Sequence, residues 1–320
     1  MPRVLSTQQT DDFITRGWTK VEQAIPHEQA VKVQDFLWER LAERGVLRGD
    51  KSTWRNPMEF IAENYNQSPF HECATARLAD AISDLVGAGR WVAEHEVGWW
   101  GWWPVNFAVG ADQIWDVPAD EWHIDSPSAG TYPTAPDQGL LVICLFSELR
   151  PRGGGTLVLE GSHQIAVRFL QENPELTQKQ TNAALRELTP YLRALCGRDG
   201  NAENTPGTDT SNVRGVDAVK IERPVDLATT PRIEYFMNQT HIDEAGTRLR
   251  VAEVTGSPGD VILAHPFMLH SPSFNHCGVP RFMCNRKTPL FEPMQLERSD
   301  GEYSVLEESI RVALSQSLVS

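Results

Sequence analysis

The chain has few cysteines and no long apolar run. Its five cysteines are scattered through 320 residues without a Cys-x-x-Cys pair, which argues against a disulfide framework or a zinc ribbon. No stretch of about 18 apolar residues is present, so we expect no membrane span. Residues 1–6 lead directly into polar residues and lack the apolar core of a secretory signal. We therefore expect a cytoplasmic protein.

Basic residues are also scarce relative to acidic ones. Lys and Arg total 29 against 43 Asp and Glu, which gives a formal net charge of −14. Binding to a nucleic acid backbone requires clustered Lys and Arg, so we expect no nucleic acid partner. An acidic protein can still use one local arginine to bind an anionic small molecule. A small-molecule substrate is therefore the partner that we expect.

Residues 1–90 have the pattern of a mainly helical region. Apolar residues between 28 and 44 recur with the 3.6-residue period of a helix, and Gly45 follows as a typical C-terminal cap. A second helix is predicted over 72–86. The Gly-Ala-Gly sequence at 87–89 then marks the end of this region.

The composition changes to that of β structure after residue 90. Seven of the ten tryptophans lie between 91 and 122, among Gly and Pro, which favours strands. These indoles can fill a sheet core or line an aromatic cavity. Short apolar runs follow at 140–146 and 156–159. The Gly-rich segment 150–155 between them predicts a turn joining neighbouring strands.

An insertion of about 165–230 separates these strands from the next group. Apolar spacing predicts helix over 174–195, interrupted by Pro190. The polar stretch 197–215 has no periodicity, which is typical of an exposed loop. A lid over a site and plain disorder are both compatible with such a loop.

Strand patterns resume downstream and suggest one fold for the whole chain. We predict strands over 232–237, 249–254, 261–264 and 281–289, and an amphipathic helix over 303–318. The expected fold class is mainly β with flanking helices (α+β), a cupin-like jelly roll or double-stranded β-helix. A single domain, 1–320, is expected, with helical support at 1–90, the jelly-roll core at 91–290, and a C-terminal extension with a helix at 291–320.

The triplet His123-Ile124-Asp125 is the strongest candidate for chemistry. In a strand, side chains two residues apart point to the same face, which would place an imidazole beside a carboxylate. A second histidine would complete the 2-His-1-carboxylate set that binds non-haem Fe(II) and leaves positions open. Our candidate for this third ligand is His270.

The order of several short motifs resembles the phytanoyl-CoA dioxygenase family. The motifs span residues 100–290 and comprise Trp122 to Asp125, the run Gly154 to His163, Gly259-Asp260 before a strand, and His270 followed by Asn275 and Arg281. This resemblance implies a jelly-roll oxygenase that uses Fe(II), 2-oxoglutarate as cosubstrate and O2. Such an enzyme hydroxylates or desaturates a small organic molecule and yields succinate and CO2.

The resemblance also implies cosubstrate contacts. Arg281 is expected to hold the distal carboxylate of 2-oxoglutarate, since a guanidinium donates two parallel hydrogen bonds to a carboxylate. Asn275 belongs to the same motif. Many family members have Ser or Thr where this chain has Pro272, so Ser271 or Ser273 is expected to substitute.

Further histidines are expected to have structural roles. His265 lies five residues before His270, so a regular strand would point the two to opposite faces. The spacing to Asn275 and Arg281 selects His270 as the ligand and leaves His265 packed or supporting. His163 is expected to cap the turn after a strand, and His276 to lie in a loop. Arg286 is expected on the face of its strand opposite Arg281.

Two other functions remain compatible with these residues. A cupin-like isomerase or hydrolase with another metal would use the same barrel without needing Arg281, and a degenerate binding module would keep the fold without turnover. In halogenases related to the family, a small residue replaces the carboxylate ligand. The carboxylate of Asp125 therefore favours hydroxylation or desaturation over halogenation.

Overall fold

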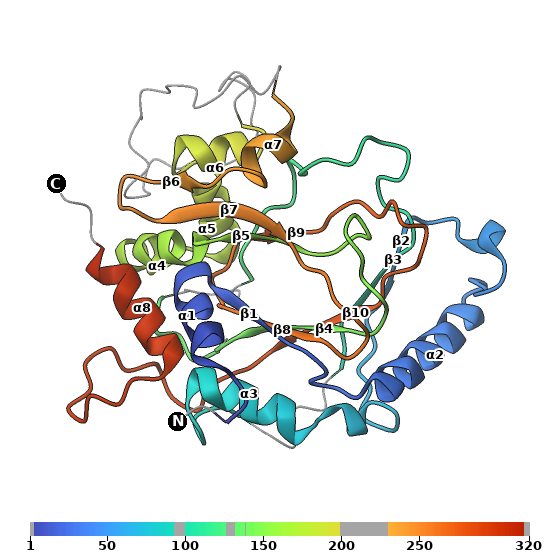
Figure 1. Ribbon diagram of the computed structural model, residues 1–320, viewed down its shortest axis with the longest axis horizontal. Coiled ribbons are helices and arrows are strands. Elements are labelled where there is room, and N and C mark those ends of the chain that lie inside the picture. The colour runs from blue at the N-terminus through green and yellow to red at the C-terminus, as the bar shows by residue number, and fades with distance from the viewer. Residues whose placement is uncertain (1–2, 93–99, 126–131, 138, 199–229, 317–320) are drawn as a thin grey trace.

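The protein has a mixed α+β fold built on two four-stranded antiparallel sheets (Figure 1). The computed structural model describes residues 3–92, 100–125, 132–137, 139–198 and 230–316. None of the described helices has the length and apolar character needed to cross a membrane.

The two sheets draw strands from distant parts of the chain. The first has the order β1 (Trp18–Val21), β8 (Val261–Ala264), β4 (Leu141–Leu145) and β10 (Met283–Lys287). The second has the order β6 (His241–Ile242), β7 (Arg248–Glu253), β5 (Leu157–Glu160) and β9 (His270–Ser271). A separate pair consists of β2 (Met58–Ile61) and β3 (Trp103–Asn106).

The facing sides of the two sheets enclose an apolar interior. Ile143 of β4, Val158 of β5 and Met283 of β10 belong to one buried cluster between the sheets. The alternate residue Val142 belongs to the larger cluster on the outer side, because successive side chains of a strand point to opposite faces. This alternation fixes which side chains reach the space between the sheets.

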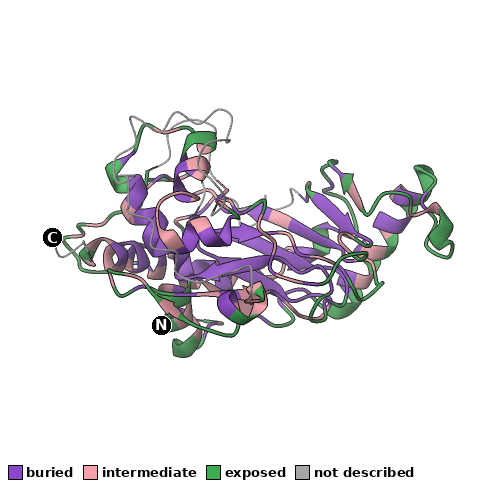
Figure 2. Ribbon diagram, turned by 90° about the horizontal axis from the view of Figure 1, so that it is seen from above, coloured by how far each residue is buried: buried purple, intermediate pink, exposed green. Residues whose placement is uncertain are grey.

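Helices cover the outside of both sheets (Figures 1 and 2). At one end of the molecule, α8 packs against three other helices, α1, α3 and α4. The helices are α1 (Thr7–Arg16), α2 (His27–Glu43), α3 (Ala76–Val86), α4 (Ser162–Glu172), α5 (Gln178–Leu185), α6 (Pro190–Leu195), α7 (Arg232–Phe236) and α8 (Val305–Ser315), with 3-10 turns at Lys51–Thr53 and His71–Cys73.

Several expected elements are confirmed. The helices predicted over 28–44, 72–86 and 303–318 correspond to α2, α3 and α8. The interruption at Pro190 separates α5 from α6, and this proline occupies the start of α6, where its missing N–H costs nothing. The strands expected at 249–254 and 261–264 are β7 and β8. The polar loop expected at 197–215 lies almost entirely outside the described residues.

The strand predicted over 232–237 is wrong, because this segment is the helix α7. The side chain of Asp116 accepts hydrogen bonds from the backbone N–H groups of Arg232 and Ile233, at 3.3 and 2.8 Å. These are free donors at a helix N-terminus, and a carboxylate there is stabilising. The capping group comes from a distant part of the chain, so local sequence could not reveal it.

One further expectation is incomplete and another is wrong. The region 1–90 contains the strands β1 and β2 besides its helices, and β1 forms an edge of the first sheet. The segment 150–155 does not join neighbouring strands, because β4 and β5 belong to different sheets. It carries the chain from one sheet to the other.

Most of the described tryptophans of the 91–122 segment fill the core. Trp100, Trp103 and Trp122 are fully buried. Trp100 and Trp103 pack against Phe146 in an aromatic cluster with centroid distances of 5.7 and 5.3 Å. The placement of these indoles favours core packing over an aromatic-walled cavity.

Two histidines form a buried pair away from the predicted site. His163 lies in the first turn of α4 rather than in a turn after a strand, and its Nε2 lies 3.0 Å from the carbonyl oxygen of Ile14. Its ring is 4.8 Å from that of His265, centroid to centroid. Burial lowers the pKa of His163 to about 4 and lowers that of His265 well below its usual value. Both are therefore neutral at pH 7.

Because these two buried histidines are neutral, we expect the protein to lose stability in mild acid. In the unfolded chain His163 binds a proton below about pH 6.5, but the folded protein resists protonation down to about pH 4. Stability therefore falls as pH drops through this window, by about 2 kcal/mol at pH 5 from His163 alone. Urea unfolding at pH 7 and pH 5 measures the loss. For His163→Gln, the free energy of unfolding should depend less on pH by that amount. An unchanged pH dependence would contradict the lowered pKa of His163.

Candidate metal centre

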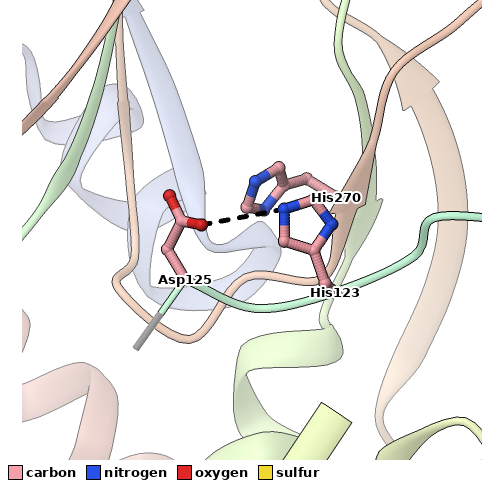
Figure 3. Close-up of side chains that lie close together, drawn as sticks. All are labelled: His123, Asp125 and His270. Carbon is pink, nitrogen blue, oxygen red and sulfur yellow. Dashed lines mark ion pairs between the residues drawn. The ribbon is translucent and has the colours of Figure 1, made fainter. Parts of the chain in front are cut away.

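Three side chains that could bind a metal converge at the second sheet: His123, Asp125 and His270 (Figure 3). One potential ligand atom from each lies within 4.8 Å of the other two. His123 Nε2 is 3.7 Å from Asp125 Oδ1, and the two imidazole rings are 4.3 Å apart, centroid to centroid. The described residues contain no other group of three such side chains this close together.

The backbone brings the two histidines together. His123 N–H donates to His270 O at 3.0 Å, and His270 N–H donates to His123 O at 2.9 Å. Residues paired in this way in an antiparallel ladder point their side chains to the same face. His270 also pairs with Val158 of β5, whose side chain lies in the interior cluster. Both imidazoles therefore face the space between the sheets.

The His123–Asp125 segment makes only an isolated bridge rather than the strand that the sequence suggested. Buried and exposed side chains nevertheless alternate along it as in an extended strand. Trp122 and Ile124 are fully buried, whereas the side chains of His123 and Asp125 are 33% and 27% exposed. The two potential ligands therefore share the open face, as expected.

Backbone carbonyls orient both imidazole rings. His123 Nδ1 lies 2.6 Å from Glu121 O, and His270 Nδ1 lies 3.0 Å from Met268 O. Each carbonyl can only accept, so each Nδ1 carries the proton, and Nε2 keeps its lone pair for a metal. Glu121 has a φ of 62°, an uncommon conformation for a residue other than glycine, and this turn aims its carbonyl at the ring.

The charge state of His270 and the donor atoms of the cluster suit a divalent metal. Burial is the main cause of a lowered pKa at His270, and the neighbouring His123 adds to it, while Asp125 opposes it. A neutral imidazole is the form that binds a metal. Two imidazole nitrogens and one carboxylate are the donor set of non-haem Fe(II) sites with open positions. The residues present therefore fit such an iron.

Arg281 is a buried cation inside the same fold. It is only 3% exposed. Its Nη1 donates to Gly154 O at 2.8 Å and its Nη2 to Pro104 O at 3.2 Å, while Nε has no hydrogen-bond partner in the part of the chain that the structure describes. Among the described residues, no carboxylate lies within ion-pair distance of it. Burial lowers its pKa to about 10, so the guanidinium remains charged at neutral pH.

The strand register places Arg281 toward the interior. Phe282 and Cys284 belong to the outer cluster, whereas Met283 between them belongs to the interior one. Arg281 therefore points to the side where the imidazoles lie. Arg286 points the other way and lies over the ring of Trp100, at 4.2 Å, as the sequence predicted.

The other expected cosubstrate residues are engaged with backbone. The Ser273 hydroxyl donates to Gly155 O at 2.5 Å. The Asn275 amide donates to Asn106 O and Val279 O at 2.9 and 2.8 Å. Ser273 thus holds the segment that carries Gly154, while Asn275 holds the loop before Arg281. Their expected contact with a cosubstrate stays a prediction.

Two other histidines, His265 and His276, make their contacts elsewhere. His265 is buried among Phe13, His163 and Phe267, so it packs as expected. His276 is an exposed loop residue whose Nε2 lies 2.9 Å from Gly110 O.

One interior polar residue escaped the sequence analysis. Asn285 pairs with Ile143 of β4, so its side chain shares the inner face with Met283. Its Oδ1 has no hydrogen-bond partner among the described residues. The signal was present, because Asn285 lies four residues after Arg281 and strand alternation puts both on one face.

Comparisons with known proteins give only distant structural similarity. No family model matches the chain, and no curated protein matches it. Among solved structures, HygX from Streptomyces hygroscopicus with nickel and 2-oxoglutarate bound is 13% identical, with a TM-score of 0.43, over 88% of this chain and 86% of that chain. EctD from S. alaskensis with bound Fe is 18% identical, with a TM-score of 0.44, over 92% and 82%.

A third similar structure is SnoK, a non-heme alpha ketoglutarate dependent carbocyclase from nogalamycin biosynthesis. It is 10% identical, with a TM-score of 0.46, over 94% of this chain and 92% of that chain. At such low similarity, the function of this chain has to be inferred from its own residues.

Proposed function

We propose that this chain is an Fe(II)- and 2-oxoglutarate-dependent oxygenase that acts on a small organic molecule. The observation that carries the proposal is the combination of a 2-His-1-carboxylate cluster with a buried, charged Arg281 that lacks an acidic partner among the described residues. A buried charge is costly unless it is paired. An anionic cosubstrate would supply the missing partner.

The two sheets are proposed to be the halves of a double-stranded β-helix. Their facing sides enclose one interior cluster with side chains from both sheets, and this arrangement is typical of barrels that bind ligands inside. In this proposal the described elements form a single domain. The flanking helices cover its outer faces, where the larger buried apolar cluster lies.

His123, Asp125 and His270 are proposed to hold the iron through Nε2, a carboxylate oxygen and Nε2. Iron and 2-oxoglutarate together supply oxidation of a C–H bond by O2, with succinate and CO2 as coproducts. The protein itself orients the groups that hold the iron. The carbonyls of Glu121 and Met268 hold the rings in the metal-binding tautomer, and the apolar interior limits access of water.

Arg281 is proposed to bind the distal carboxylate of 2-oxoglutarate. Its Nε has no partner among the described residues, and its terminal nitrogens are fixed by two carbonyls, so the guanidinium is held in one orientation. A charged group held in this way costs no reordering when the carboxylate binds. Ser273 and Asn275 would support this contact by fixing the backbone around the arginine.

Hydroxylation or desaturation is the proposed outcome, because Asp125 supplies the carboxylate ligand. An isomerase or hydrolase built on the same three ligands would have no use for the charge of Arg281, which no described carboxylate pairs. The buried arginine therefore favours the oxygenase over these alternatives.

Anaerobic addition of Fe(II) and 2-oxoglutarate tests this proposal. The two together should produce a weak visible charge-transfer band, because 2-oxoglutarate chelates the iron at its open positions. Fe(II) alone or 2-oxoglutarate alone should give no band. Admission of O2 should then bleach the band and release succinate. Absence of a band in the presence of both would reject the oxygenase.

A further inference from the structure

The segment that carries His123 and Asp125 is held along both of its backbone edges. Along one edge, the N–H and C=O of His123 bond to His270. Successive residues of an extended strand direct these groups to opposite edges, so Trp122 and Ile124 present theirs to the other side. In a sheet another strand would lie there. In this protein side chains from the region of α5 lie there instead.

Asn182 of α5 makes both bonds to Ile124 that a neighbouring strand would make. Its Oδ1 accepts from Ile124 N–H at 2.8 Å, and its Nδ2 donates to Ile124 O at 3.1 Å. Arg186 Nε donates to Trp122 O at 2.7 Å. A longer contact, 3.5 Å, joins Gln178 Nε2 to Ile124 O.

The helical spacing explains how one helix reaches this edge. Residues 178, 182 and 186 are four apart, and side chains at this spacing lie on one face of a helix. The helix itself is anchored at its start, where Thr177 and Gln180 form a capping box. Asn182 is half-buried, while Ile124 is fully buried. The amide-to-peptide pairing is therefore largely shielded from water.

We propose that Asn182 is a positioning residue for the metal centre, assisted by Arg186, and that α5 replaces a strand at the outer edge of the ligand segment. This inference rests on the proposed metal site. Ile124 lies between the two ligands, so fixing both of its polar backbone groups fixes how His123 and Asp125 project. The insertion between β5 and β7 thus has a supporting role at the centre, through its described part.

The expected consequence is tighter metal binding without any contact between Asn182 and the metal. A ligand segment held at one edge only would have to be ordered when the metal binds, and that ordering weakens binding. Groups that support metal ligands typically contribute about 10–100-fold to affinity. We therefore expect Asn182→Ala to raise the Kd for a divalent metal by a factor in this range.

The test is a titration of the metal-free protein with Ni(II) alone, in which calorimetry measures the binding. The wild-type chain should bind one equivalent. Asn182→Ala should bind more weakly, whereas Lys179→Ala, a change at an exposed residue of the same helix, should match the wild type. Asn182→Asp keeps the acceptor for Ile124 N–H but loses the donor, so it should be intermediate. If the alanine variant does not fold, Asn182→Asp provides the test in its place.

Thermal unfolding of the metal-free variants separates positioning from general stability. If Asn182→Ala and Asn182→Asp lower Tm but leave the Kd for Ni(II) unchanged, Asn182 has only a structural role and the inference is wrong. If wild-type protein itself binds no Ni(II), the proposed metal site fails, and with it the proposed function. If wild type binds Ni(II) normally and the variants bind it equally well, only the inference about Asn182 is overturned, and the proposed function stands.

Discussion

Replacing His270 with alanine is expected to abolish stoichiometric metal binding. The change removes one of the three atoms that converge within 4.8 Å, and the remaining pair would bind through one imidazole and one carboxylate only. Loss of a group that merely supports a ligand typically costs about 10–100-fold in affinity, so loss of a ligand itself should cost more. Calorimetric titration with Ni(II) or anaerobic Fe(II) measures the effect.

His265→Ala is the matched control for this experiment. It removes another buried histidine, five residues earlier, whose ring packs against His163 and Phe13 rather than at the metal centre. The control should lower Tm through the cavity that it creates while leaving one metal equivalent bound. If His265→Ala lost the metal and His270→Ala kept it, the assignment of the ligands would be reversed.

The sequence predicted that His270 lies beside His123 and Asp125, and the structure places it there, although part of the argument was incorrect. The parity argument assumed one regular strand through both histidines. In the structure, β8 ends at Ala264, and residues 265–269 form a turn before β9 begins at His270. The spacing to Asn275 and Arg281 selected the same histidine without assuming a regular strand. It depends on motif order and not on local conformation.

Contacts between distant segments explain what the sequence could not predict. The helix α7 depends on Asp116, more than a hundred residues earlier, for its N-terminal cap. Arg232 at its start also donates to Val117 O and Ala194 O. Likewise, Asn182 is an ordinary polar residue in its own helix, and only the fold brings it to Ile124. Periodicity predicts that a helix forms, but not what its polar face binds.

The buried arginine was predictable for a different reason. Arg281 follows His270 by eleven residues, and the expectation of a cosubstrate-binding arginine depended on this spacing. Its lack of an acidic partner among the described residues emerged only from the structure. Sequence identifies the charge, whereas the fold determines whether anything in the protein neutralises it.

Arg281→Leu is expected to raise the concentration of 2-oxoglutarate required for half-maximal turnover. Hydrogen bonds to charged groups contribute roughly 1.5–3 kcal/mol, which corresponds to about 10- to 150-fold. The requirement for metal should change little, because the three proposed metal ligands come from other segments of the chain. Succinate release measured against 2-oxoglutarate concentration, at saturating Fe(II), gives the shift.

Arg281→Lys distinguishes loss of an anchor from loss of structure. Arg281 also binds the carbonyls of Gly154 and Pro104, so the leucine variant can lose stability as well as the anchor. Lysine keeps the charge but lacks the planar pair of donors, so its 2-oxoglutarate requirement should lie between those of wild type and Arg281→Leu. The charge of lysine still attracts a carboxylate, so this ranking of the three proteins is expected if residue 281 binds the cosubstrate. A folded Arg281→Leu protein with an unchanged requirement would place the cosubstrate's distal carboxylate on another residue.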